Sequence, residues 1–232
     1  MNLVLVAHGT RKPAGVSMIG DLAAGVGRTL NRRVRVAVAD VLGPTPGEAL
    51  AGLHDAPAIV VPAFLSRGYH VRSDIPRQIA ASAHPDVTVT RTLGPDPEMV
   101  RVVVHRLIES GWRVGDSVIL AAAGTSDPHA QGDLRLTAAM LSAAIGSRVE
   151  PAFAAIGEPR VCDAVARLRR TGARRVVLAS YLLADGLFQD RLRAAGADIV
   201  TEPLGSHPGT IRLIASRFRR AVRDDRYLTA AG

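Results

Sequence analysis

The chain has 232 residues, of which 47% are hydrophobic and only 3% aromatic, and its formal net charge is +8. This length allows one large domain or two small ones with real cores, and a charged fraction of 22% excludes a disordered chain. Cys162 is the single cysteine, which excludes a disulfide framework and a cysteine-based zinc site.

Short apolar runs alternate with longer helical patterns from one end of the chain to the other. The pattern predicts strands over residues 2–7, 33–39, 58–62 and 87–91, and helices over 15–30, 46–53, 72–83 and 96–110. A second set follows, with strands over 117–122, 148–153, 175–180 and 197–201, and helices over 130–145, 159–171, 187–194 and 208–223. Such alternation is typical of right-handed crossovers and parallel sheets. We expect an α/β protein with two domains, residues 1–113 and 114–232.

The two halves of the chain resemble each other. Three pairs of segments carry the similarity: residues 4–10 with 119–125 and 40–44 with 155–159, both at an offset of 115, and 93–97 with 204–208, at an offset of 111. Self-similarity of this length predicts two copies of one fold related by a pseudo-twofold axis. Because such a chain already contains its own pair, we expect a monomer.

Three polar side chains follow predicted strands of the first half. These residues are His8, Asp40 and His70. The carboxyl ends of parallel strands meet at one edge of a sheet, so all three side chains are expected at a single crevice. Two imidazoles and a carboxylate suit a late first-row divalent ion and leave coordination positions open. The alternatives are histidines that form hydrogen bonds within loops and an Asp40 that caps a turn.

The second half serves as an internal control for these residues. It carries Ala123 opposite His8 and Ala155 opposite Asp40, whereas His70 falls opposite Leu187 or Phe188. The replacements keep the backbone signals and remove the polar groups. The second half is therefore expected to have kept the fold and lost the site.

Two motifs of the first half resemble those of a known family. They are His8-Gly9-Thr10 and the long segment from Val61 to Pro76, which reads VPAFLSRGYHVRSDIP. Both resemble the sirohydrochlorin chelatases, the class II chelatases of siroheme and cobalamin biosynthesis, in their long two-domain form. The resemblance implies two tandem chelatase-like (flavodoxin-like) domains, each a four-stranded parallel sheet flanked by helices. The first domain would be catalytic and the second a degenerate repeat.

The same resemblance implies an activity and its residues. A lyase of this family inserts Fe²⁺ or Co²⁺ into sirohydrochlorin, with the metal as a substrate and no organic cofactor. The family's metal-binding and catalytic histidines correspond to His8 and His70, and its acidic partner, usually glutamate, corresponds to Asp40. The polycarboxylate tetrapyrrole would contact residues that flank the histidines in sequence, namely Gly9, Thr10, Arg11, Lys12, Arg67, Gly68, Tyr69 and Arg72. For the basic residues the alternative is a solvent-facing loop charge.

Other functions stay open at this point. Within the family, the rivals are a nickel chelatase and a protoporphyrin ferrochelatase, although protoporphyrin carries few carboxylates to match the basic loops. Outside the enzymes, the alternative is a metal carrier or tetrapyrrole-binding protein with the same pocket. No arginine cluster alternates with stacking aromatic residues, so nucleic acid is not an expected partner. The sequence contains no signal segment and no apolar run of about 18 residues, which predicts a cytoplasmic protein without a membrane contact.

Overall fold

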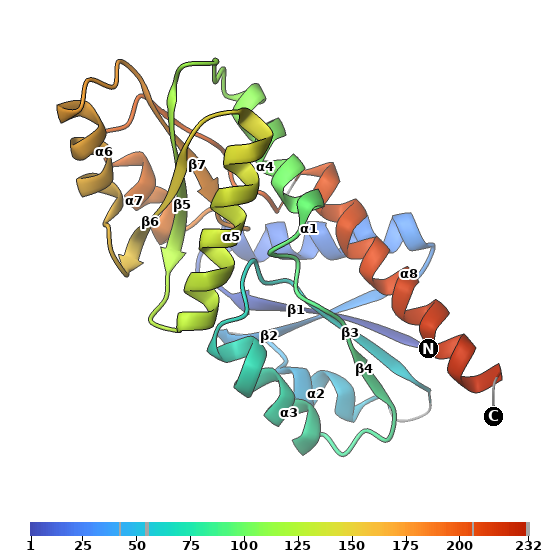
Figure 1. The fold of residues 1–232 in the computed structure, drawn as a ribbon. Helices are drawn as coiled ribbons and strands as arrows, with labels where there is room; N and C mark the ends of the chain where they lie inside the picture. The colour runs from blue at the N-terminus through green and yellow to red at the C-terminus, as the bar shows by residue number, and fades with distance from the viewer. Residues whose placement is uncertain (42, 54–55, 206, 231–232) are drawn as a thin grey trace. The chain divides into compact units, whose positions relative to one another are not determined.

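The fold comes from a computed structural model that describes residues 1–41, 43–53, 56–205 and 207–230, with side chains up to Arg223. It contains two four-stranded parallel sheets, each flanked by helices (Figure 1). The predicted α/β class with two chelatase-like sheets is therefore confirmed. Within the described residues, no helix combines the length and the apolar character that a membrane crossing requires.

The first sheet has the strand order β2-β1-β3-β4. Its strands are β1 (Asn2–Gly9), β2 (Val34–Val41), β3 (Ala58–Pro62) and β4 (Val87–Val89). β3 is buried along its whole length, as expected of a central parallel strand rich in valine and isoleucine. The helices between these strands are α1 (Pro13–Leu30), α2 (Pro46–Ala51) and α3 (Ile75–Ala81), and a π-helical turn (His70–Asp74) precedes α3.

The second sheet repeats this order as β6-β5-β7-β8. Its strands are β5 (Ser117–Gly124), β6 (Val149–Ile156), β7 (Val176–Tyr181) and β8 (Ile199–Val200). The helices of the second half are α5 (Pro128–Ile145), α6 (Val161–Arg170), α7 (Leu187–Arg193) and α8 (Pro208–Ala230), and α4 (Pro97–Glu109) precedes them. Cys162 is exposed on α6, since it occupies the polar face of that helix beside Asp163.

Helix boundaries follow local signals in the sequence. α2 begins with a capping box, in which the Thr45 side chain accepts from the Glu48 backbone and the Glu48 carboxylate accepts from the Thr45 backbone. Asp127 caps α5 by accepting from the first backbone N–H groups of that helix. α1 ends at Asn31, which adopts the left-handed conformation with φ of 51°. These boundaries hold the strand ends that carry the polar side chains at defined positions.

The strand registers reproduce the repeat that the sequence shows. Leu3 lies opposite Val34 in the first sheet, and Val118 lies opposite Val149 in the second, at the same offset of 115. β2 and β6 also bulge at equivalent positions: between Ala7 and Gly9 one residue of β1 faces two of β2, and between Ala122 and Gly124 one residue of β5 faces two of β6. The second half therefore repeats the first even in this irregular strand pairing.

Gly9 and Gly124 are required by this bulge. Their φ angles are +95° and +107°, in the region that favours glycine. A Cβ atom on Gly9 would lie 2.6 Å from the carbonyl oxygen of Val41, and one on Gly124 would meet the carbonyl oxygen of Ile156 even more closely. Because both copies share the requirement, Gly9 has a backbone role that is independent of any ligand.

The structure divides the chain into two compact units, and their boundaries differ from the expected boundary at residue 113. One unit joins Met1–Leu93 with the chain from Thr210 onward, and the other spans Gly94–Gly209. α8 belongs to the first unit because Ile211 packs directly against Gly25 of α1. α4 belongs to the second unit, where Arg106 donates to the carbonyl oxygen of Pro203 at 3.1 Å. The catalytic role of residues 1–113 and the degenerate role of 114–232 stay predictions.

Candidate metal centre

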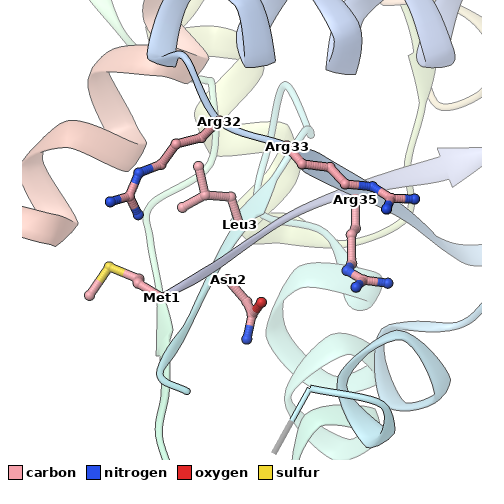
Figure 2. Close-up of a pocket in the computed structure, with 6 residues that line it drawn as sticks. All are labelled: Met1, Asn2, Leu3, Arg32, Arg33 and Arg35. Atoms are coloured by element: carbon pink, nitrogen blue, oxygen red, sulfur yellow. The ribbon is translucent and has the colours of Figure 1, made fainter. Parts of the chain in front are cut away.

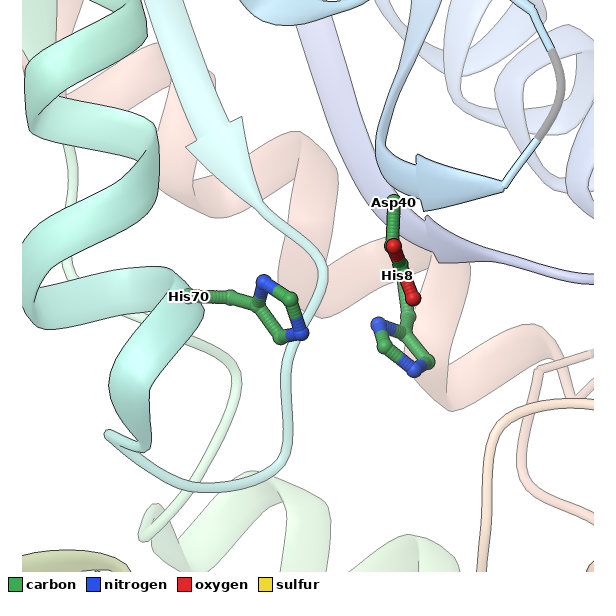
Figure 3. A group of neighbouring side chains, drawn as sticks. All are labelled: His8, Asp40 and His70. Atoms are coloured by element: carbon green, nitrogen blue, oxygen red, sulfur yellow. The ribbon is translucent and has the colours of Figure 1, made fainter.

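The ends of three chain segments bring together His8, Asp40 and His70. His8 is the next-to-last residue of β1, Asp40 is the next-to-last residue of β2, and His70 opens the π-helical turn after β3. One ligand atom of each side chain lies within 4.8 Å of the other two. No other trio of His, Cys, Asp or Glu residues in the described part of the chain comes this close. Figure 3 shows the Asp40 carboxylate beside His8, with the His70 ring facing both.

The two imidazole rings are neighbours without being stacked. Their centroids lie 4.8 Å apart and their planes are inclined by 53°. Donors on one ion, each about 2.1 Å from it, are separated by at most about 4.2 Å. The ligand atoms of His8 and His70 lie within 4.8 Å of each other, so a small movement would let both rings bind one ion. Phe64 lies beside both rings, with centroid distances of 6.3 Å to His8 and 6.2 Å to His70, and limits how far they can move.

The local electrostatics favour a neutral His8. Loss of solvent around the ring lowers the pKa of His8 below its ordinary value, and repulsion from a protonated His70 lowers it further. Asp40 acts in the opposite direction, because its carboxylate stabilises the charged imidazole. The net result is a lowered pKa. A neutral imidazole is the form that binds a metal ion or accepts a proton.

His70 is held by a carboxylate on its far side. Its Nδ1 atom lies 3.1 Å from Oδ2 of Asp74, whose side chain is buried. Arg77 and Gln78 donate to the other carboxylate oxygen at 2.8 and 3.1 Å. Burial alone would raise the pKa of Asp74, but the hydrogen bonds from His70, Gln78 and Arg77 outweigh it and leave the pKa lowered. An ionised Asp74 can only accept a hydrogen bond, so it selects the His70 tautomer with hydrogen on Nδ1. The unprotonated Nε2 atom can then bind a metal ion.

The π-helical turn explains how His70 and Asp74 meet. The backbone N–H of Ile75 donates to the carbonyl oxygen of His70, five residues earlier. Pro76 follows, has no N–H and in an α-helical register would press against the carbonyl of Arg72. A widened turn before the proline relieves that contact. It also brings the side chains four residues apart, His70 and Asp74, within hydrogen-bond distance.

The residues expected at the tetrapyrrole occupy the two loops around this centre. Arg11, Lys12, Arg67 and Arg72 are exposed, and so is Tyr69, at 57%. The Thr10 hydroxyl accepts from the backbone N–H of Lys12 at 3.2 Å, so it holds the loop rather than capping α1. The Gly68 carbonyl accepts from the backbone N–H groups of Val71 and Arg72, each at 3.1 Å.

Two contributors to the centre were missed in the sequence. Asp74 lies four residues after His70 in a helical pattern, a spacing that places two side chains on one face and could have indicated the pair. Phe64 gave no comparable signal, because an aromatic residue after a strand is usually part of the core. In the second half, Ala123 and Ala155 stand at the positions of His8 and Asp40, and Phe188 packs against the core there.

Comparison with known proteins identifies the family of the chain. The model of the CbiX family matches residues 2–110 and 117–221. The chain belongs to the CbiX family. A sirohydrochlorin cobaltochelatase of Priestia megaterium is 30% identical over 144 residues, covering 58% of this chain and 47% of the relative. A sirohydrochlorin ferrochelatase of the same organism is 25% identical over 175 residues, covering 69% and 66%. The chain thus spans between about half and two thirds of these CbiX relatives.

Solved structures show the same fold. SirB from Bacillus subtilis, solved with Fe³⁺, superposes with a TM-score of 0.82 at 22% identity, over 94% of this chain and 95% of SirB. CbiX, the terminal enzyme of siroheme biosynthesis in denitrifying bacteria, gives a TM-score of 0.73 at 23% identity, over 95% and 99%. At these identities the likeness establishes the two-domain CbiX architecture and nothing about the substrate.

Proposed function

We propose that the protein is a sirohydrochlorin chelatase that inserts Fe²⁺ or Co²⁺ into the tetrapyrrole. One observation carries the proposal: His8, Asp40 and His70 bring three ligand atoms within 4.8 Å at the carboxyl edge of the first sheet. Membership of the CbiX family supports it, as do two relatives named sirohydrochlorin cobaltochelatase and ferrochelatase. Nitrogen and oxygen ligands suit both metals, so the donor set alone does not choose between them.

The side chains have complementary tasks in this reaction. Insertion requires the metal to lose water and the macrocycle to lose two pyrrole protons. His8 and His70 hold the incoming metal through neutral nitrogens, and Asp40 adds a negative charge that balances the cation. As the metal passes to the macrocycle, the freed His8 nitrogen accepts one pyrrole proton and solvent water takes up the other. Asp74 keeps the Nε2 atom of His70 directed at the metal and is a positioning residue.

The tetrapyrrole itself is recognised through its carboxylates. Guanidinium and ammonium groups bind carboxylates through charge-assisted hydrogen bonds. Arg11 and Lys12 follow His8 in one loop, and Arg67 and Arg72 flank His70 in the other. We propose that these four cations orient the macrocycle so that its pyrrole nitrogens face the metal. Exposed Tyr69 offers a ring against which the macrocycle can pack.

The decisive experiment follows the absorbance of sirohydrochlorin mixed with Fe²⁺ or Co²⁺, with and without the protein. The wild-type protein is expected to accelerate metal insertion above the spontaneous rate. His8→Ala and His70→Ala are each expected to abolish the acceleration while folding is retained. Phe188→Ala, at one of the two positions that fall opposite His70, is the matched control and should leave turnover per folded molecule unchanged. Metal binding by the wild type without acceleration would instead identify a carrier.

Several expectations from the sequence stay predictions. They are a monomeric state, a cytoplasmic location, the absence of an organic cofactor, and the absence of nucleic-acid or membrane partners. None of them enters the proposed reaction.

A further inference from the structure

A hollow at the amino end of the first sheet collects three arginines. It has a volume of about 270 Å³ and is lined by Met1, Asn2, Leu3, Arg32, Arg33 and Arg35 (Figure 2). Arg32 and Arg33 belong to the turn between α1 and β2, and Arg35 is the second residue of β2. The candidate metal centre lies at the carboxyl ends of the same strands. The hollow is therefore a separate place in the first unit.

The charges of this hollow are uncompensated within the described part of the chain. All three arginine side chains are exposed, and none forms an ion pair with a described carboxylate. Among the residues that the structure describes, none of those lining the hollow is acidic. The Asn2 amide donates to the carbonyl oxygens of Leu53 and Ala56, at 3.3 and 3.2 Å. Guanidinium groups gathered in this way repel one another unless an anion lies between them.

The second copy of the fold shows that the scaffold does not require these arginines. At the offset of 115, Arg32, Arg33 and Arg35 correspond to Ser147, Arg148 and Glu150. Glu150 pairs with Arg148 on its own strand and with Arg167 of α6, at 2.6 Å. The equivalent surface of the second copy is therefore neutralised from within, whereas that of the first copy is left cationic.

The backbone sets the spacing of two of the guanidinium groups. Arg33 directly precedes β2 and Arg35 is its second residue, so their backbone positions are about 6.6 Å apart on an extended chain. Figure 2 shows both side chains on one side of Leu3 and Arg32 on the other. Each guanidinium group can donate two hydrogen bonds to oxygens of a ligand in the hollow.

A second hollow extends the cationic surface. It shares Leu3 and Arg32 with the first, has a volume of about 390 Å³ and is also lined by Thr29, Leu30, Phe218, Arg219, Val222 and Arg223. Arg219 donates to the carbonyl oxygen of Thr29 at 3.1 Å, which fixes one more positive charge beside Arg32. Together the two hollows have the size of a small-molecule site.

We propose that Arg33 and Arg35, with Arg32, form a binding site for a small oxygen dianion. The chemistry fits a phosphate group or a compact dicarboxylate, each of which presents several charged oxygens to the guanidinium groups that line the hollow. The source can be free inorganic phosphate, a phosphate group on a larger metabolite, or a dicarboxylic acid. This site does not depend on the proposed chelatase activity.

The test is a calorimetric titration of the metal-free full chain with inorganic phosphate and, separately, with succinate, at constant ionic strength set with chloride. The wild type is expected to bind at least one of the two, and the comparison identifies which oxygen chemistry is preferred. The double variant R33Q/R35Q is expected to bind at least about tenfold more weakly. Arg148→Gln, the counterpart of Arg33, is the matched control and should bind as the wild type does.

Two results would overturn the proposal. The first is a wild type that binds neither anion more tightly than chloride. The second is an equal loss of binding in R33Q/R35Q and Arg148→Gln, which would mean that only the overall positive charge matters. Circular dichroism of each variant checks that the fold is intact, and the site is on an exposed surface where arginine-to-glutamine changes cost little stability.

Discussion

The Nδ1 atom of His70 lies 3.1 Å from Oδ2 of Asp74 inside one widened helical turn. This contact fixes the ring that faces His8, because the carboxylate is itself buried and held by Arg77 and Gln78. A ligand histidine that is free to rotate would need to be ordered each time a metal arrives. The contact with Asp74 orders the His70 ring in advance, so metal binding does not have to supply the conformational entropy of ordering it.

Replacing Asp74 with asparagine tests this role. The variant keeps the shape but can donate to Nδ1, which favours the opposite tautomer and turns a protonated nitrogen toward the metal. We expect Co²⁺ affinity to fall about 10- to 100-fold, as measured by titration of the visible absorption of bound cobalt. Arg77→Gln, which removes a neighbour of the carboxylate but not the contact with His70, is the control. Unchanged cobalt affinity and spectrum in Asp74→Asn would show that the contact is only structural.

The titration of His8 gives a second prediction. Since desolvation and His70 lower its pKa, the His8 ring is expected to titrate below about 6.5, the ordinary value for histidine. Asp40→Asn should lower the midpoint further, because the carboxylate of Asp40 stabilises the protonated ring. NMR of the imidazole protons of the metal-free protein measures both midpoints. A rise of the pKa in Asp40→Asn would contradict the assigned sign.

The same shift predicts how stability changes with pH. A pKa lower in the folded than in the unfolded state means that the unfolded chain binds the proton more tightly. The contribution of His8 to stability is therefore lost as pH falls through about 6.5 toward the folded pKa. His8→Gln should lose less unfolding free energy than the wild type between about pH 7 and about pH 5. Urea unfolding at both pH values gives the comparison.

Gly9 and Gly124 offer a matched pair of backbone substitutions. Each has a positive φ and approaches the neighbouring strand closely, so alanine at either position is expected to cost about 1–3 kcal/mol of unfolding free energy. Only Gly9→Ala should also weaken cobalt binding, because it displaces the adjacent His8. Denaturant unfolding and cobalt titration of both variants separate the two effects. Equal loss of cobalt binding in the two would indicate a general loss of folding.

Phe188 tests the assignment of the second half as a copy without a metal site. Its partly buried ring packs against the core cluster of the second sheet, and Arg191 lies 5.9 Å from its centroid. Phe188→Ala is expected to lower the unfolding free energy by about 2–4 kcal/mol. Metal affinity of the folded fraction should stay that of the wild type. A selective loss of metal binding would show that this residue contributes to the centre.

The fold was largely predictable because short buried strands have a simple signature. Valine-rich runs such as β3 have the composition of buried strands, and the repeat between the halves predicted two copies of one fold. The equal strand orders of the two sheets agree with that repeat. Placing histidines at strand ends was enough to predict that His8, Asp40 and His70 would be neighbours. Strand order alone could not give the inclination of their rings, which depends on Phe64 and Asp74.

Other features depend on packing that no local pattern encodes. α4 and α8 were predicted as helices, but their sequences do not predict which sheet each helix packs against. The contact of Ile211 with Gly25 and the buried hydrogen bond from Arg217 to the carbonyl oxygen of Thr92, at 3.2 Å, decide the place of α8. Likewise, the sequence does not show that Arg32, Arg33 and Arg35 lack acidic partners. The structure shows the contrast, because Glu150, the counterpart of Arg35, pairs with Arg148 and Arg167 in the second copy.

The return of α8 to the first unit has a consequence for biosynthesis. During translation, the strands that bear His8, Asp40 and His70 emerge early, yet the helix that covers Gly25 emerges only after the whole of Gly94–Gly209. Until α8 has been synthesised, the face of α1 that it covers stays exposed to solvent. A nascent chain of this protein therefore contains the residues of the candidate metal centre well before it can complete the domain that supports them.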